Sequence, residues 1–301
     1  MSDTHSQPTP GAAPESKAHV DTSAATSINP GSTVSLCIMS GKGGVGKTNL
    51  ALNLGLTLRD MGHKLLLMDC DLGLANLDVL LGLTPEKNLQ DLLGGEVRPE
   101  DVLLHVEDGL DILPAASGVP ELVEMDQNQR DDLFDTLTDM IKSYDFLLLD
   151  LGAGISGTVL AMARMAQMRV VLVTPEPTSL TDGYAIIKVL NAKFGVRDFC
   201  VVVNQATAKE AKETFVRLNM ACKNFLGFEL VNLGHVRLDR TLTQAVINQT
   251  PLARFAPECP AIKDIRVLAQ RVSRYREQNL QTISGRKALK EFLPGATARN
   301  P

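Results

Sequence analysis

The segment from Gly41 to Thr48 has the residue types and spacing that bind phosphate groups. It reads Gly-Lys-Gly-Gly-Val-Gly-Lys-Thr, which is the Walker A pattern. Glycines let backbone N–H groups surround phosphate oxygens, and a following helix adds the positive end of its dipole. In such a loop Lys47 contacts the β- and γ-phosphates, and the Thr48 hydroxyl binds Mg²⁺. The segment predicts a nucleoside triphosphate site with Mg²⁺, and its expected contacts are Gly43, Gly44, Val45, Gly46, Lys47, Thr48 and Asn49.

The flanks of this loop provide the context that the pattern requires. An apolar run from Val34 to Met39 precedes it, and a helical pattern from Asn49 to Met61 follows it. This strand-loop-helix order argues against a glycine-rich loop that binds no nucleotide. Lys42 is the unusual residue, because the ordinary pattern needs only the lysine at position 47.

Carboxylates follow two other predicted strands. Asp69 and Asp71 end one strand, and Asp150 ends the apolar run from Phe146 to Leu149. In a P-loop protein such carboxylates hold Mg²⁺ or orient the water that attacks the γ-phosphate. We expect Asp69 and Asp150, with Thr48, at the metal, and Asp71 at the attacking water. The alternative is that Asp69 and Asp71 cap their loop, as aspartates often do.

Three later segments also follow predicted strands. The glycines of Asp150–Gly154 allow the backbone to switch when the γ-phosphate leaves. An amide at Asn204 or Gln205 could bind both hydrogen-bonding edges of adenine, or simply cap its strand, and the residue types favour neither. The proline-containing Thr174–Ser179 segment is interpreted as a structural turn before a helix capped by Ser179 or Thr181.

Composition points to a globular protein with no membrane span. The chain has 301 residues, of which 44% are hydrophobic, and a net charge of −5. No apolar run reaches the length of a spanning helix and no signal segment is present, so we expect a cytoplasmic protein. Its acidity argues weakly against broad nucleic-acid binding. The scattered cysteines and histidines favour buried reduced thiols, and no metal other than Mg²⁺.

The order of the segments predicts an α/β fold with a doubly wound, mainly parallel sheet and helices on both faces. Residues 1–32 are rich in Ser, Thr, Pro, Ala and Gly and predict a disordered tail. Residues 33–280 form the expected domain, ending in a surface helix over Ala261–Asn279, and residues 281–301 form a C-terminal tail. The expected strands are Val34–Met39, Lys64–Asp69, Leu110–Pro114, Asp145–Asp150, Arg169–Thr174, Phe199–Asn204 and Glu229–Val236.

These motifs together resemble the MinD/ParA class of ATPases. The resemblance covers about residues 34–272 and rests on Lys42–Thr48, on Asp69 and Asp71, and on Asp150–Gly154. Two further segments, Asp71–Asp78 and Thr174–Asp182, are similar to the flagellar-number regulators of the FlhG/FleN group. Cell-division MinD proteins usually place Arg where Ala75 stands.

The resemblance implies a slow, partner-stimulated ATPase that binds ATP and Mg²⁺ and forms a face-to-face homodimer. In this class the residue matching Lys42 reaches the phosphates of the other subunit, where its charge would neutralise them. The resemblance also implies that Asn204 contacts adenine and that Arg237 to Asp239 lie near the base. ATP dimers of the class settle on the inner membrane through a C-terminal amphipathic helix and leave after hydrolysis.

Two positions depart from the pattern of the class. Flagellar regulators often carry an N-terminal Asp-Gln-Ala-x-x-Leu-Arg motif that stimulates a signal-recognition-particle-type GTPase, and residues 1–33 contain no such motif. Activation of that partner is therefore left open. Leu151 stands where the class commonly has Thr, which removes a hydroxyl beside the metal-binding acid.

The leading interpretation is a regulatory ATPase that controls flagellar number or placement, with flagellar switch proteins or a flagellar transcription regulator as further candidate partners. The alternatives are a positioning ATPase for the septum or for DNA cargo, and a weakly hydrolysing ATP-binding scaffold or antiregulator of a transcription factor. In the tail from Ile283 to Leu293, a helix would place Leu289, Phe292 and Leu293 on one face among basic residues. This pattern is typical of membrane-surface helices, although a packed or frayed extension fits it equally well on residues alone.

Overall fold

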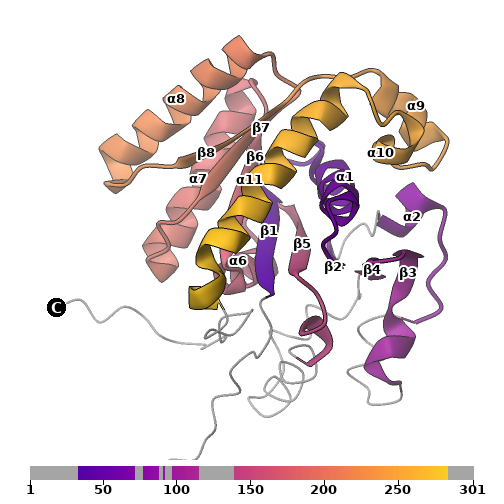
Figure 1. Ribbon diagram of the computed structural model, residues 1–301. Helices are drawn as coiled ribbons and strands as arrows, with labels where there is room; N and C mark the ends of the chain where they lie inside the picture. Colours follow the sequence, from indigo (N-terminus) through magenta and orange to yellow (C-terminus); the bar gives the residue numbers. More distant parts are fainter. Residues whose placement is uncertain (1–32, 72–76, 88–90, 92–96, 115–138, 284–301) are drawn as a thin grey trace, which may run out of the picture.

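The computed structural model describes residues 33–71, 77–87, 91, 97–114 and 139–283. Within these ranges one eight-stranded sheet has the order β3-β4-β2-β5-β1-β6-β7-β8 (Figure 1). Neighbouring strands are parallel except for β3 and β4. The predicted doubly wound, mainly parallel α/β fold is confirmed. The strands are β1 Val34–Ser40, β2 Leu65–Cys70, β3 Leu104–Glu107, β4 Leu110–Leu113, β5 Phe146–Ala153, β6 Met168–Val173, β7 Cys200–Asn204 and β8 Val231–Val236.

Helices cover both faces of this sheet (Figure 1). The first face packs against α6, α7 and α8, and the second against α1, α9, α10 and α11. In β5 the alternation is plain, because Leu147, Leu149 and Leu151 point to the first core and Phe146 and Leu148 to the second. The helices are α1 Lys47–Asp60, α2 Leu77–Leu81, α6 Gly157–Met165, α7 Pro177–Phe194, α8 Ala208–Leu226, α9 Thr241–Ile247, α10 Leu252–Phe255 and α11 Pro260–Ile283, with a 3₁₀ turn at Pro99–Val102.

The sheet places the predicted acids side by side at the carboxyl ends of its central strands. β1 lies between β5 and β6, and the loop that leaves β1 leads directly into α1. Asp69 of β2 is paired in register with Asp150 of β5, which in turn is paired with Ile38 of β1. The phosphate loop and the acids therefore lie together at the carboxyl ends of the strands, where ligands bind in open parallel sheets.

The start of α7 differs from the prediction. Helix α7 begins at Pro177 with Glu176 as its N-cap, so the prediction of a cap at Ser179 or Thr181 is wrong. A proline in the first turn has its φ already set for a helix, which starts α7 earlier. The Ser179 hydroxyl instead accepts a hydrogen bond from the Thr174 backbone N–H at 2.9 Å.

At the C-terminal end, α11 is longer than predicted. It continues to Ile283, whose side chain is buried in the second core. Ile283 is therefore part of the domain and is not available to a separate tail helix. The rest of the predicted amphipathic tail lies outside the described residues, as does the N-terminal tail. No helix within the described ranges combines the length and apolarity needed to cross a lipid bilayer.

Candidate nucleotide-binding site

The phosphate loop depends on glycine at positions that no larger residue could occupy. Gly44 and Gly46 have φ angles of 75° and 93°, in the left-handed region that glycine adopts without strain. A Cβ atom on Gly41 would lie 2.1 Å from the Asp182 carbonyl oxygen of α7, and one on Gly46 would lie 2.7 Å from the Asn204 amide nitrogen. The loop is therefore closely packed between the starts of α7 and α1 and the end of β7.

The two lysines of the loop lie in different surroundings. Lys47 is 8% exposed, at the start of α1. Burial lowers the pKa of its ammonium group, while the charges of Asp150 and Asp71 oppose that shift. A buried cation that faces carboxylates at the start of a helix is suited to bind phosphate oxygens. The predicted contact of Lys47 with the β- and γ-phosphates stays a prediction.

Lys42 instead contacts the segment that leads into α7. Its side chain is 39% exposed, and its ammonium group donates to the Glu176 carboxylate at 2.5 Å and to the Thr178 hydroxyl at 3.4 Å. Both partners belong to the segment that was interpreted as purely structural. Glu176 is thus a functional candidate that sequence reasoning missed, and its place beside Pro177 in the Thr174–Ser179 motif was the signal available.

Asp150 has the properties of a metal-binding carboxylate. It is 1% exposed, and among the described residues its Oδ1 atom is buried with no hydrogen-bond partner. Burial raises the pKa of its carboxyl to about 7, Asp69 and Asp71 add to the shift, and a hydrogen bond with Thr48 and the charge of Lys47 oppose it. A buried acid oxygen without a partner has a desolvation cost that a cation would remove. Asp150 and Thr48 therefore fit Mg²⁺.

The described residues do not form a complete metal cage by themselves, since no three His, Cys, Asp or Glu side chains among them gather around one point. Mg²⁺ ordinarily binds through one or two protein groups, waters and substrate phosphates, so a P-loop site needs no such cage. The remaining ligands would come from the nucleotide.

The other two acids differ in their roles. Asp69 is 2% exposed, and its two oxygens accept hydrogen bonds from the backbone N–H groups of Asp71 at 3.0 Å and Leu77 at 3.4 Å. Asp69 thus caps its loop, as the alternative interpretation states. Asp71 is half-buried, and its carboxylate lies against Gly152, where a Cβ atom would be 3.3 Å from Asp71 Oδ1. Leu151 is buried in the first core.

A cavity opens beside the loop, at Gly46 and the first turn of α1. Asn204 stands at its edge, and its amide N–H donates to the Val45 carbonyl at 2.8 Å, which ties β7 to the phosphate loop. Arg237 also lines the cavity, but its guanidinium forms an ion pair with Asp264 at 2.7 Å. The cavity is lined by Gly46, Asn49, Leu50, Asn53, Asn204, Gln205, Val236, Arg237, Leu238, Asp239, Leu242, Thr243, Leu252, Ala261 and Ile265.

Comparisons with known proteins agree with this geometry. A family model described as "ParA: NUBPL iron-transfer P-loop NTPase" matches residues 32–273. The chain is 39% identical over 238 residues to the antiactivator FleN of Pseudomonas aeruginosa. This alignment covers 79% of the chain and 85% of FleN. It is 35% identical over 230 residues to the flagellum site-determining protein YlxH of Helicobacter pylori, in an alignment that covers 76% of this chain and 78% of YlxH.

Solved structures give the same result. A chain of the MinC:MinD cell division protein complex of Aquifex aeolicus matches with a TM-score of 0.64 and 29% identity, over 80% of this chain and 96% of that chain. MinD of Pyrococcus horikoshii, solved with Mg-ADP, has the same fold at a TM-score of 0.63 and 23% identity, over 81% and 97% of the two chains. The chain therefore belongs to the MinD/ParA class of P-loop NTPases, and within that class it is similar to the flagellar regulators FleN and YlxH.

Proposed function

We propose that this protein is an ATP-driven molecular switch that forms a homodimer on binding ATP and controls flagellar number or placement. The observation that carries the proposal is the different placement of the two lysines in one loop. Lys47 is buried near Asp150 and Asp71. Lys42 is partly exposed and is paired with Glu176, the N-cap of α7. A cation so placed is accessible to the phosphates of a second subunit.

In this proposal the phosphate loop holds the triphosphate through its backbone N–H groups and Lys47. Asp71 orients a water molecule toward the γ-phosphorus, and attack by that water breaks the bond to the β-phosphate oxygen and yields ADP and phosphate. The position of its carboxylate against Gly152 supports this role, because the backbone that follows Asp150 can sense whether the γ-phosphate is present.

Mg²⁺, when bound, neutralises the charge that develops on the phosphate oxygens. Thr48 and Asp150 would hold it, the latter directly or through water, and Asp69 would support the loop beside them. Asn204 and the segment from Arg237 to Asp239 would surround the base and ribose, because they line the cavity next to the loop. The base would be adenine, as in the relatives of the MinD/ParA class.

The flagellar assignment rests on similarity to FleN and YlxH. The proposal also includes a cycle between two nucleotide-dependent states. The nucleotide-free or ADP-bound chain would be a cytoplasmic monomer, and the ATP dimer would sit at the inner membrane surface through residues 284–293. Candidate partners are a flagellar transcription regulator, flagellar switch proteins and a signal-recognition-particle-type GTPase. Septum positioning is the second candidate, because MinD proteins are among the relatives.

Two experiments test the proposal. Light scattering coupled to size exclusion should give the 32.5 kDa monomer with Mg²⁺ and ADP, and twice that mass with Mg²⁺ and a slowly hydrolysed ATP analogue. In the host, replacement of the gene by a Lys47→Ala allele should change the number or position of flagella with normal cell division. Minicells with normal flagella would favour septum positioning, and equal masses with both nucleotides would contradict the switch.

A further inference from the structure

Helix α10 forms one wall of the cavity beside the phosphate loop. It contains only Leu252–Phe255, follows α9 and precedes α11 in the chain. Leu252 lines the cavity together with Asn49, Leu50 and Asn53 of α1, so the placement of α10 against α1 contributes to the shape of that part of the cavity. A four-residue helix cannot hold such a position by its own hydrogen bonds. Other contacts must fix it.

Asn53 of α1 supplies the inner contact. Its side chain is 1% exposed and also lines the cavity. The amide oxygen accepts a hydrogen bond from the Ala253 backbone N–H at 2.7 Å, and the amide nitrogen donates to the Asn49 carbonyl at 2.7 Å. One carboxamide thus joins two elements that line the cavity, accepting one hydrogen bond and donating another.

Asn53 supplies both an acceptor and a donor to this arrangement. Asn has a low intrinsic preference for helix interiors, so its presence in the middle of α1 needs a tertiary reason. An apolar residue of similar size would leave the Ala253 N–H buried without a partner, which is costly. The contact joins residues 200 positions apart.

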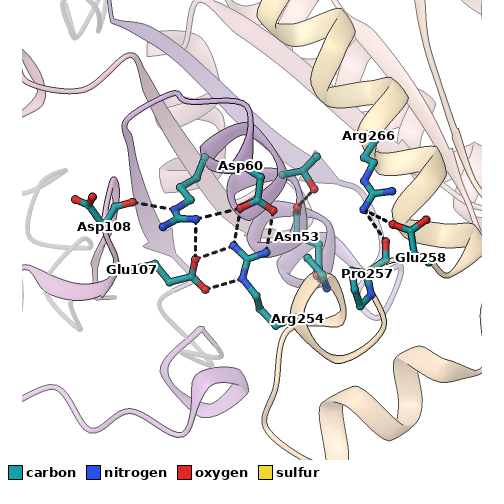
Figure 2. A network of polar contacts seen from close by, with 11 residues as sticks. Asn53, Asp60, Glu107, Asp108, Arg254, Pro257, Glu258 and Arg266 are labelled. Carbon is teal, nitrogen blue, oxygen red and sulfur yellow. Dashed lines mark hydrogen bonds and ion pairs between the residues drawn. The ribbon is translucent and has the colours of Figure 1, made fainter.

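Arg254 supplies an outer contact that does not reach the cavity. Its guanidinium pairs with Glu107 of β3 at 2.6 Å and with Asp60 of α1 at 2.9 Å, and Figure 2 shows this network beside Asn53. Hydrogen bonding to Arg254 is the main cause that lowers the pKa of Glu107. For Asp60 burial is the largest single effect and raises the pKa, but the hydrogen bonds and charges of Arg254 and Arg59 together lower it. Arg254 therefore anchors the same helix from the solvent side and provides a matched control.

We propose that Asn53 is a positioning residue for the nucleoside part of the bound nucleotide. Its carboxamide holds the Leu252 wall at the distance from α1 that fits the base and ribose, whereas the phosphates are held by Gly43–Thr48. This inference rests on the proposed nucleotide site. It predicts that Asn53 affects the affinity for ATP and ADP but not the affinity for a phosphate chain without a nucleoside.

The test compares affinities for Mg-ATP, Mg-ADP and Mg-tripolyphosphate, measured by displacement of a fluorescent ATP analogue. Asn53→Leu should weaken ATP and ADP binding about tenfold or more, while tripolyphosphate affinity stays within about twofold of wild type. Asn53→Asp keeps the acceptor for Ala253 and loses the donor to Asn49, so it should lose less affinity than Asn53→Leu. Arg254→Gln removes the outer anchor of the same helix and keeps the Asn53–Ala253 contact, so it should lower the melting temperature but weaken ATP and ADP binding clearly less than Asn53→Leu.

Each other outcome has a definite meaning. Equal losses for ATP and tripolyphosphate in Asn53→Leu would show general disruption and overturn the inference, as would Arg254→Gln weakening ATP as much as Asn53→Leu. If Asn53→Leu does not fold, Asn53→Ala decides, because it also removes the acceptor for the Ala253 N–H. Wild-type ATP affinity in that variant would overturn the inference. A wild-type protein that binds tripolyphosphate but gains nothing from the nucleoside would instead contradict the proposed nucleotide site.

Discussion

The ammonium group of Lys42 and the carboxylate of Glu176 form an ion pair within the same chain, 134 residues apart in sequence. The two side chains are 39% and 59% exposed. Exposed pairs of this kind are worth about 0 to 1 kcal/mol, so the multiple charges of a triphosphate could displace Glu176. The ion pair is therefore a weak restraint on Lys42, and the proposed dimer would have to break it.

Removal of this restraint should favour the dimer. In Glu176→Gln the lysine no longer loses an ion pair when it reaches the partner, so the dimer dissociation constant with an ATP analogue should fall by up to about fivefold. Sedimentation velocity over a concentration series measures it. Glu213→Gln, at an exposed position on α8, is the control. A dimer weakened by Glu176→Gln would mean that Glu176 supports the interface instead of restraining Lys42.

Asp71 is predicted to act in hydrolysis and not in binding. Asp71→Asn should lower ATP turnover by about 10² or more, in the range of groups that position or activate a nucleophile, and leave the ATP dissociation constant nearly unchanged. Single-turnover hydrolysis and equilibrium binding separate the two effects. Asp108→Asn, at an exposed turn, should change neither. Turnover that survives Asp71→Asn would move the water-orienting role to another residue.

Asp150 makes the nucleotide-free protein sensitive to pH. Its carboxyl pKa is about 7 in the fold against a reference value of 3.8, so the folded state holds this proton more tightly than the unfolded chain. Stability therefore falls as pH rises through this interval. With EDTA and no nucleotide, the melting temperature of Asp150→Asn should exceed that of wild type by more at pH 8 than at pH 5, because wild type loses this stability progressively between pH 3.8 and about 7. The same difference at both pH values would contradict the shift.

The local patterns of the chain predict the fold well, because parallel strands are long apolar runs and the phosphate loop has a fixed sequence. Strand β3 was missed, since Leu104–Glu107 is short and alternates with polar residues, and only its antiparallel pairing with β4 defines it. The Lys42–Glu176 and Asn53–Ala253 contacts were also missed, because each joins segments more than a hundred positions apart. Spacing within a motif carries no information about such pairs.

The predicted membrane helix can be tested with a truncation whose position follows from the structure. Ile283 is buried, so removal of residues after Ile283 spares the core, whereas truncation at Thr282 would not. Sedimentation with anionic vesicles should be ATP-dependent for the full chain and lost in the truncated protein. Phe292→Glu should weaken it, because three large apolar groups and a few basic residues give only marginal binding per copy. Equal sedimentation of full and truncated chains would exclude the tail as an anchor.

The central claim, that the two lysines of one loop serve two subunits, is tested most directly by mass measurement of two variants with the slowly hydrolysed ATP analogue. Lys47→Ala should lose nucleotide binding and remain at 32.5 kDa. Lys42→Ala should bind the analogue with nearly wild-type affinity and also remain at that mass, because only the contact to the partner's phosphates is removed. A Lys42→Ala protein that binds the analogue and runs at twice the monomer mass would contradict the account.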